Sequence, residues 1–344
     1  MKFKLAFIGF GVVGQGLGDI LLEKKDWLKD KYNFEYEVVA ISDMMKGSVY
    51  KEDGLDLEKV MKFVNEGHNL DDYQIGKTGW GPIKTIKESS ANVIIEVTYT
   101  DMETGGPALE HVKTALQEGK HVVSTNKGPV ANEVKKLVEL AKQKGIYYRF
   151  EGTVLSGTPA INLALWNLAG CEITEIKGIV NGTTNYILSQ MEEGMEYDEA
   201  LKKAQELGYA EADPTGDVEG IDAQGKIEIL SNTLMGADIE LEDVERKGIT
   251  DISLDDVKKA KEEGYRWKLV GSTKKTDGHV VAKVAPEKLP LDHPLASVMG
   301  PTNALTFTTD YLGDVTIIGP GAGKKETGFA LLVDLLAINN IMEA

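Results

Sequence analysis

The sequence is poor in the residues that build disulfides, zinc centres and membrane spans. Its 344 residues include one cysteine, Cys171, so no disulfide can form within the chain, and this favours a reducing, cytoplasmic location. There is no CxxC pair and no spaced Cys/His cluster, which argues against a zinc site of the common kind. No run of about 18 apolar residues occurs, so we expect no membrane-spanning helix.

Basic residues are scarce relative to acidic ones. The chain has 38 Lys and Arg against 55 Asp and Glu, which gives a formal net charge of -17. Nucleic-acid-binding proteins need a basic face that replaces phosphate counterions, so neither nucleic acid nor an anionic membrane surface is an expected partner. Apolar residues make up 42% of the chain. That content supports a sizeable core, and the length allows two domains or one large α/β unit with additions.

The first 150 residues alternate between short apolar runs and segments with helical character. We expect strands at residues 4–8, 36–41, 92–98, 121–127 and 146–151. We expect helices at residues 12–23, 57–66, 82–88, 107–118 and 130–144. This alternation is typical of a doubly wound α/β domain of the Rossmann type, in which ligands bind beyond the carboxyl ends of the strands.

A glycine-rich motif, G-x-G-x-x-G, follows the first expected strand and opens the first expected helix. It consists of Gly9, Phe10, Gly11, Val12, Val13 and Gly14. The first glycine allows a tight turn, the second lets the backbone approach a pyrophosphate, and the third allows close helix–strand packing. The helix N-terminus then faces the anion. We therefore expect this motif to bind NAD or NADP rather than to form a turn without a ligand.

An acid at the end of the second strand bears on the choice between NAD and NADP. A ribose-binding acid usually follows the glycine motif by roughly 20 positions. Asp43 lies further from the motif than this, because a polar insert at residues 24–35 intervenes. An acid here favours NAD, whereas Lys46 and Ser48 suit the 2′-phosphate of NADP. The sequence leaves this choice open. It also leaves open that Asp43 is only a turn residue.

Polar residues lie at the ends of three later strands of the same domain. Thr98, Lys127 and Glu151 each follow or end an apolar run, which places them at the edge where such sheets bind ligands. We include Thr98 and Lys127 among the candidate cofactor-binding residues. Lys127 either reaches a substrate oxygen or caps a loop, and its position alone does not decide between these roles.

After Glu151 the pattern changes to an α+β unit with an open, mixed and mainly antiparallel sheet. A second glycine loop at residues 319–323 then precedes an apolar helix. This loop either touches the ligand or cofactor, or closes the domain. We expect a Rossmann domain at 1–151, a second domain at 152–318, and a C-terminal helix at 319–344 that returns to the first domain.

The most acidic stretch of the chain lies in the second domain. Five carboxylates between Glu211 and Asp222 precede a single lysine, Lys226, at the start of an apolar run. A proline and two glycines disfavour a helix before residue 221, so we expect the acids on a loop and Lys226 in the first turns of a helix. Asp222 and Lys226 are four apart and share a helix face. The stretch is either a site or a solvated surface loop.

Three stretches together resemble the homoserine dehydrogenase family. Residues 208–226 (GYAEADPTGDVEGIDAQGK) are the most specific, and residues 179–186 (IVNGTTNY) and 124–127 (STNK) also match. The resemblance covers nearly the whole chain, including the order of the two glycine loops. It is to the short form of the family, without a C-terminal ACT domain or a fused aspartate kinase, so we expect no feedback regulation through such a domain.

The resemblance assigns roles to individual residues. It implies that Lys226 is catalytic and that Lys127 is a second lysine lining the site. Acids that hold the substrate amino group or order the site are Glu211, Asp217 and Asp222, while Thr183 and Tyr209 match substrate-side positions. Gly323 matches a glycine that touches the cofactor. A monovalent cation such as sodium is expected mainly on main-chain oxygens of Glu151, Val154, Ser156 and Thr158. The remaining acids of the loop, Asp213 and Glu219, are expected to be solvated.

The implied reaction is the NAD(P)-dependent interconversion of L-homoserine and L-aspartate 4-semialdehyde in threonine, methionine and isoleucine biosynthesis. The resemblance implies a cytoplasmic homodimer formed through the sheet of the second domain. One alternative is another Rossmann-type dehydrogenase, such as aspartate-semialdehyde dehydrogenase, but Cys171 lacks the context of a nucleophile. A second alternative is a dinucleotide-sensing dimeric regulator, which needs a basic DNA-reading element that the sequence does not show.

Overall fold

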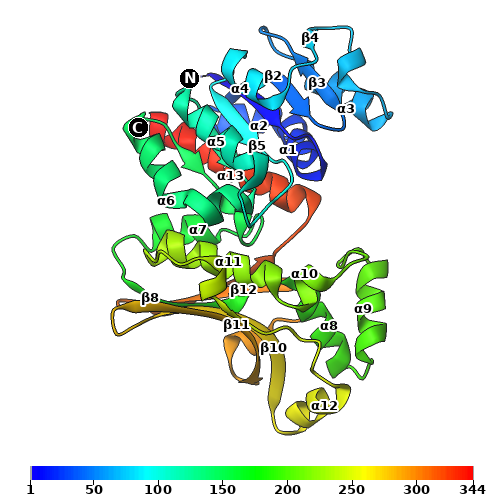
Figure 1. Ribbon diagram of the computed structural model, residues 1–344, viewed down its shortest axis with the longest axis vertical. Helices are drawn as coiled ribbons and strands as arrows, with labels where there is room; N and C mark the ends of the chain where they lie inside the picture. The colour runs from blue at the N-terminus through cyan, green and yellow to red at the C-terminus, as the bar shows by residue number, and fades with distance from the viewer. Residues whose placement is uncertain (1, 344) are drawn as a thin grey trace. The chain divides into compact units, whose positions relative to one another are not determined.

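The computed structural model describes residues 2–343, which divide into two compact units (Figure 1). The first unit comprises the residues up to Gly157 together with the C-terminal segment from Gly323, and the second spans Thr158–Ala322. The sequence places these divisions a few residues earlier, after residues 151 and 318. The expected fold class, a Rossmann α/β domain and an α+β domain with a mixed sheet, is confirmed.

The first unit is built on a seven-stranded sheet of order β4-β3-β2-β1-β5-β6-β7. Its strands are β1 (Lys2–Ile8), β2 (Glu35–Asp43), β3 (Gly47–Tyr50), β4 (Lys77–Thr78), β5 (Val93–Glu96), β6 (His121–Ser124) and β7 (Tyr148–Arg149). The strands from β2 through β1 to β7 are parallel, and β3 and β4 are antiparallel additions. The strand order reverses between β1 and β5, which is where ligands bind in such sheets.

The helices of the first unit flank this sheet, and the last one returns from the end of the chain. They are α1 (Val12–Glu23), α2 (Lys25–Tyr32), α3 (Leu57–Asn65), α4 (Pro82–Glu88), α5 (Gly106–Gln117), α6 (Lys127–Gln143) and α13 (Lys324–Glu343), with short turns η1 (Leu70–Asp72) and η2 (Glu151–Thr153). Figure 1 shows the red helix α13 among the elements of this unit. A Cβ on Gly328 would lie 2.5 Å from the carbonyl carbon of Gly16 in α1, so glycines allow the two helices to touch.

Two features of the first unit are missing from the sequence-based expectation. Helix α2 covers most of the polar insert; it buries Leu28 and ends at Asn33, whose φ of 50° is left-handed. The short antiparallel strands β3 and β4 extend the sheet. Neither strand is long enough to show the alternation by which strands are recognised in a sequence, and their turn depends on Asp71, which accepts a hydrogen bond from the backbone N–H of Ser48 (2.9 Å).

The second unit is built on a six-stranded sheet of order β13-β12-β8-β10-β11-β9. Its strands are β8 (Ile173–Ile179), β9 (Glu245–Arg246), β10 (Tyr265–Thr276), β11 (His279–Pro290), β12 (Thr302–Thr309) and β13 (Gly313–Pro320). All neighbours are antiparallel except β9 and β11, which are parallel. The sheet is therefore mixed and mainly antiparallel, as the sequence predicts.

The helices of the second unit include three that pack directly against this sheet, α8, α11 and α12. The full set is α7 (Ala160–Asn162), η3 (Leu163–Asn167), α8 (Gly182–Glu192), α9 (Tyr197–Glu206), α10 (Thr215–Val218), α11 (Ile221–Leu234), η4 (Leu241–Asp243), α12 (Leu254–Glu262) and η5 (Pro294–Ser297). Segment η3 is a π-helical turn. Within residues 2–343, no helix combines the length and apolar character needed to cross a membrane.

Helix α10 corrects one prediction, since the acidic stretch is not wholly a loop before residue 221. Asp213 Oδ1 accepts hydrogen bonds from the backbone N–H (3.1 Å) and from Oγ1 (2.6 Å) of Thr215, which stabilises the start of this single turn. Pro214 precedes the first helical residue, where its missing N–H costs no hydrogen bond. The backbone N–H of Val218 then donates to the carbonyl of Pro214 at 2.9 Å.

Candidate functional site

The glycine motif forms the turn between β1 and α1, and its three glycines have different surroundings. Gly9 has φ +89°, and a Cβ there would lie 2.6 Å from the carbonyl oxygen of Val97, so only glycine fits. A Cβ on Gly14 would lie 3.0 Å from the carbonyl oxygen of Gly9. In the described part of the chain, nothing lies within 4 Å of the Cβ position of Gly11, so a ligand has room to approach the backbone there. These surroundings fit a bound dinucleotide phosphate.

The other residues of the motif divide between core and surface. Phe10 is fully buried and packs edge-on against Phe7, with ring centroids 5.4 Å apart. Val13 is half-buried against the same core, whereas Val12, the first residue of α1, is 67% exposed. The helix N-terminus at the motif therefore remains open on the side of Gly11 and Val12.

Asp43 joins the end of β2 to the glycine motif. Its Oδ2 accepts a hydrogen bond from the backbone N–H of Phe10 (2.6 Å), and its Oδ1 accepts from those of Met45 and Lys46 (2.9 Å each). Asp43 thus stabilises the turn after β2 and joins it to the glycine motif. The same contacts hold a carboxylate beside the cofactor-binding motif, with Lys46 half-buried next to it.

The loops after β5 and β6 are tied together by Asn126. Its Nδ2 donates to the carbonyl oxygens of Thr98 (3.1 Å) and Tyr99 (2.9 Å), and its Oδ1 accepts from the backbone N–H of Gly128 at 3.1 Å. Asn126 is therefore the N-cap of α6, and Lys127, half-buried, is the first residue of that helix. The structure places Thr98 and Lys127 at neighbouring strand ends, as the sequence predicts.

A buried acid beneath these loops is absent from the sequence-based site. Glu96, at the end of β5, is fully buried and accepts a hydrogen bond from Thr98 Oγ1. His111 Nδ1 lies 3.4 Å from its Oε1, and Ser124 Oγ donates to its main-chain carbonyl at 2.8 Å. An acid inside the apolar run at residues 93–97 is the signal that sequence reasoning missed, because a buried carboxylate requires polar partners.

Lys226 and two acids of the acidic stretch form one cluster in the second unit. Lys226 is buried; its Nζ lies 2.7 Å from Asp222 Oδ2 and donates to the carbonyl oxygen of Val180 at 2.7 Å. Asn181 Nδ2 donates to Asp217 Oδ1 (2.6 Å) and to Asp222 Oδ2 (3.1 Å). We call Lys226, Asp217, Asp222 and Asn181 the Lys226 cluster. Of these, Asn181 is the member that sequence reasoning did not assign.

The electrostatics of the cluster are set by its acids. Burial raises the pKa of Asp217, and the nearby charge of Asp222 raises it further, while hydrogen bonds from Asn181 and Thr183 act in the opposite direction. A carboxylate that is partly withdrawn from water beside a second carboxylate favours a positively charged ligand. The cluster therefore has the charge to bind an ammonium group next to a lysine.

The remaining substrate-side candidates differ in how closely they join the cluster. Thr183 Oγ1 donates to the carbonyl oxygen of Tyr209 at 2.5 Å, and the ring of Tyr209 contacts Tyr186. Tyr209 and Glu211 are both exposed. Among the acids expected to be solvated, Asp213 is exposed, but Glu219 is half-buried and accepts from Thr250 Oγ1 at 3.0 Å.

The predicted cation-binding segment has an unusual backbone in the first unit. Ser156 is buried and has φ +54°, a left-handed conformation that costs a serine free energy. Its Oγ lies 2.8 Å from Thr327 Oγ1, and Val154 and Glu151 are buried nearby in the sequence. The hydroxyl of Ser156 is thereby joined to the first turn of α13.

Two further candidates flank the division between the units. Thr158 is the first residue of the second unit, and its Oγ1 donates to the carbonyl oxygen of Pro320 at 2.9 Å. Gly323 belongs to the first unit, and its φ of +134° requires a glycine before α13. Among residues 2–343, no three His, Cys, Asp or Glu side chains are grouped in a way that could hold a metal ion.

Comparisons with known proteins agree across the length of the chain. Residues 9–151 match the family model for the NAD-binding domain of homoserine dehydrogenase, and residues 159–336 match the model for homoserine dehydrogenase itself. An NAD(+)-dependent homoserine dehydrogenase from Pseudomonas canavaninivorans is 43% identical over 98% of this chain and 96% of its own length.

Solved structures give the same result. A putative homoserine dehydrogenase from Archaeoglobus fulgidus is similar with a TM-score of 0.88, 38% identity, and coverage of 98% of this chain and 99% of its own. A hyperthermophilic archaeal homoserine dehydrogenase mutant in complex with NADPH has a TM-score of 0.85, 33% identity, and coverage of 99% of this chain and 98% of its own. A sensing regulator or another type of dehydrogenase is not favoured. The chain belongs to the homoserine dehydrogenase family.

Proposed function

We propose that this homoserine dehydrogenase interconverts L-homoserine and L-aspartate 4-semialdehyde, that the Lys226 cluster binds the substrate, and that the glycine motif of the first unit binds the cofactor. The observation that carries the proposal is the buried Lys226 Nζ, held 2.7 Å from Asp222 and 2.7 Å from the carbonyl of Val180. These two contacts leave one N–H of the ammonium for a substrate oxygen.

The chemistry is divided between the cofactor and the side chains. A bound nicotinamide supplies the hydride chemistry. Lys226 stabilises the oxygen on which negative charge develops and gives it a proton as the aldehyde is reduced. The oxidation direction is the reverse of this step: the neutral amine that remains after Lys226 has given up its proton takes the hydroxyl proton from homoserine, directly or through a water. Asp222 holds Lys226 in position for both steps.

The substrate ammonium is assigned to the acids. Asp217 and Asp222 are bridged by the single amide of Asn181, so a positively charged group relieves the repulsion between them. Glu211 is exposed at the edge of the same acidic stretch, where it adds attraction for the ammonium. Thr183 and Tyr209 complete the substrate side.

We also propose NAD as the preferred cofactor. The Asp43 carboxylate, fastened to the glycine motif through Phe10, repels the extra phosphate of NADP and accepts from ribose hydroxyls. The relative from Pseudomonas canavaninivorans is named as NAD(+)-dependent, whereas the hyperthermophilic archaeal relative is in complex with NADPH. The charge at Asp43 is the property of this chain that supports NAD.

Further parts of the proposal concern assembly and surroundings. A monovalent cation is held mainly by main-chain oxygens of the segment from Glu151 to Thr158. The left-handed backbone conformation of Ser156 within this segment supports the proposal. A cytoplasmic homodimer forms through the sheet of the second unit, where apolar side chains such as Val281 and Ile318 are more than half exposed. The enzyme acts in the biosynthesis of threonine, methionine and isoleucine.

The test of the proposed function is a spectrophotometric assay. Purified protein is mixed with L-homoserine and either NAD or NADP, and the absorbance of the reduced nicotinamide is followed. We expect turnover with NAD at a higher kcat/KM than with NADP. No turnover with either cofactor, in either direction of the reaction, contradicts the proposal.

A further inference from the structure

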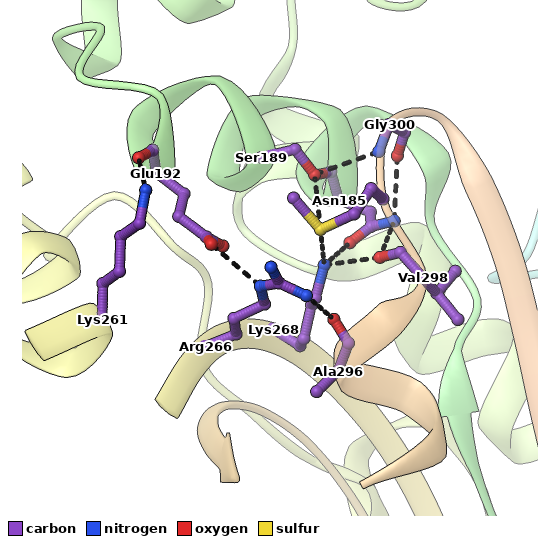
Figure 2. Close-up of polar contacts among 10 residues, drawn as sticks. Asn185, Ser189, Glu192, Lys261, Arg266, Lys268, Ala296, Val298 and Gly300 are labelled. Carbon is purple, nitrogen blue, oxygen red and sulfur yellow. Dashed lines mark hydrogen bonds and ion pairs between the residues drawn. The ribbon is translucent and has the colours of Figure 1, made fainter. Parts of the chain in front are cut away.

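Helix α8 is fastened along one side by a polar network that lies away from the Lys226 cluster. The side chains of Asn185, Ser189 and Glu192 project from successive turns of α8 toward β10 and the 296–302 segment (Figure 2). Asn185 and Ser189 are buried. A polar network in a core is retained only when its groups are satisfied, and this one has a lysine at its centre.

Lys268 is the buried charge of this network. It comes from β10, is 1% exposed, and donates from Nζ to Asn185 Oδ1 (2.8 Å) and to the carbonyl oxygen of Val298 (2.5 Å). The sulfur of Met299 lies 3.5 Å from the same nitrogen. The three donors of the ammonium thus have three partners, two of which lie on the 298–302 loop before β12.

Asn185 connects Lys268 to the rest of this loop. Its Nδ2 lies within hydrogen-bond distance of three carbonyl oxygens, those of Val298 (3.1 Å), Gly300 (2.9 Å) and Thr302 (3.1 Å). Ser189 adds a second attachment one turn later, because its Oγ accepts from the backbone N–H of Gly300 at 3.0 Å. The loop is therefore held to α8 at several successive residues.

The last turn of α8 is held in the same way. Arg266, two residues before Lys268 on β10, pairs with Glu192 at 2.8 Å and donates to the carbonyl oxygen of Ala296 at 3.1 Å (Figure 2). Strand β10, helix α8 and the 296–302 segment are thereby joined through two basic residues. A helix that is fixed at two successive turns has little freedom to slide or rotate.

The opposite end of α8 carries the substrate-side residues. Asn181 is its N-cap and bridges Asp217 and Asp222, and Thr183 in its first turn donates to Tyr209. We propose that Lys268 is a positioning residue for the homoserine site. It attaches α8 to the 298–302 loop and so holds Asn181 and Thr183 in place beside the charged residues of the Lys226 cluster. This inference rests on the proposed function of that cluster.

The charge of Lys268 makes the attachment of α8 to the 298–302 loop sensitive to pH. Burial lowers the pKa of Lys268 to about 8, with Arg266 acting in the same direction and Glu192 opposing it. Two other charged groups lie on elements packed around Lys268. Glu287 is opposite it on β11 but pairs with Lys177 and Lys283. Lys261 of α12 donates to the carbonyl oxygen of Glu192. Above about pH 8 the neutral amine has only two donors for its three partners.

The test uses Lys268→Met, with Lys275→Met as a matched control that removes an exposed lysine of the same strand, β10, outside the network. We expect Lys268→Met to raise KM for L-homoserine roughly tenfold or more, since small misplacements of binding groups have such effects, with KM for the cofactor unchanged. In the unaltered enzyme KM for L-homoserine should rise above about pH 8 as Lys268 loses its proton, and this rise should vanish in Lys268→Met. Lys275→Met should behave as the unaltered enzyme.

Folded Lys268→Met protein with an unchanged KM and an unchanged pH profile overturns the inference. If that variant does not fold, as judged by circular dichroism, Ser189→Ala takes its place. It removes one attachment of Gly300 and should raise KM for L-homoserine about threefold; an unchanged value also overturns the inference. Absence of turnover in the unaltered enzyme would instead contradict the proposed function, so the two failures are distinguishable.

Discussion

Asp217 and Asp222 share the amide of Asn181, and this contact holds two like charges close together beside a lysine. The arrangement is expensive for the folded protein, because burial and the second carboxylate both raise the pKa of Asp217. Such cost is common where a site must attract a charged ligand. At the scale of the residue, this cost supports the proposal that the cluster binds the ammonium of the substrate.

Replacing Asp217 by asparagine tests that explanation. The Asp217→Asn variant keeps the shape of the side chain but loses its charge. Because its ion pair with the substrate ammonium is lost, KM for L-homoserine should rise by about tenfold or more. In the unaltered enzyme the same KM should rise as pH falls through the raised pKa of Asp217, and the variant should lack this acid limb. Steady-state kinetics against pH measure both effects. Asp213→Asn, at an exposed acid outside the cluster, is the control.

Glu228 offers a second prediction at this scale, one that concerns stability. It is 4% exposed, its Oε2 has no hydrogen-bond partner among residues 2–343, and burial raises its pKa to about 7, with Glu242, Glu240 and Asp243 adding to the rise. A carboxyl group with a raised pKa in the folded state weakens the fold as pH rises from the unfolded pKa toward the folded one. Above about pH 7 the full cost of the ionised group is present.

The Glu228→Gln variant should therefore gain stability over the unaltered protein as pH rises. We expect a difference on the order of 1–2 kcal/mol in the free energy of unfolding above about pH 7, shrinking toward about pH 4.5. Urea unfolding at several pH values measures it. A difference that does not change with pH would show that Glu228 is not the titrating group.

At the scale of the element, the turn between β1 and α1 and the end of β2 form one unit through Asp43. This carboxylate accepts the backbone N–H groups of Phe10, Met45 and Lys46. Its charge is thus held at a fixed place beside the glycine motif. The proposed preference for NAD then depends on where these hydrogen bonds hold the carboxylate, as well as on the identity of residue 43.

Asp43→Asn should shift that preference. The variant removes the negative charge but keeps an oxygen that can accept from the N–H groups of Met45 and Lys46, so the ratio of kcat/KM for NADP over NAD should rise by roughly tenfold, the size of one altered charge contact in a binding site. Kinetics with both cofactors measure this ratio. Asp56→Asn, at the exposed N-cap of α3, is the control, and an unchanged ratio in Asp43→Asn would remove Asp43 from cofactor selection.

Elements that the sequence predicts well are those with a strong local signal. Strands β1, β2 and β5 are apolar runs bounded by turns, and α11 begins directly after Gly220. The short elements β3, β4 and α10 depend on distant or side-chain hydrogen bonds, such as those of Asp71 and Asp213, which leave no periodic pattern.

The same distinction holds for the candidate site. The pairing of Asp222 with Lys226 follows from their spacing on one helix. By contrast, Asn181, Glu96 and Lys268 make contacts with residues far away in the sequence. Their roles become visible only when the elements that carry their partners are in place, because spacing gives no information about pairing between distant elements.

At the scale of the whole molecule, the two units carry different parts of the proposed reaction. The first holds the glycine motif and Asp43, and the second holds the Lys226 cluster with the network that fastens α8. Both units match models of one family over nearly the full chain. Loss of a side chain in the second unit should therefore affect the substrate and the proton, and leave cofactor binding intact.

The most direct test of the proposed function is the Lys226→Ala variant. Removing the buried ammonium takes away the group that stabilises charge on the reacting oxygen, so kcat for L-homoserine oxidation should fall by about a thousandfold or more. Cofactor affinity, measured by fluorescence titration or calorimetry, should remain within about twofold, since binding independent of the lost contact is unaffected. A kcat close to that of the unaltered enzyme, with cofactor still bound, would contradict the assignment of Lys226 as the catalytic residue.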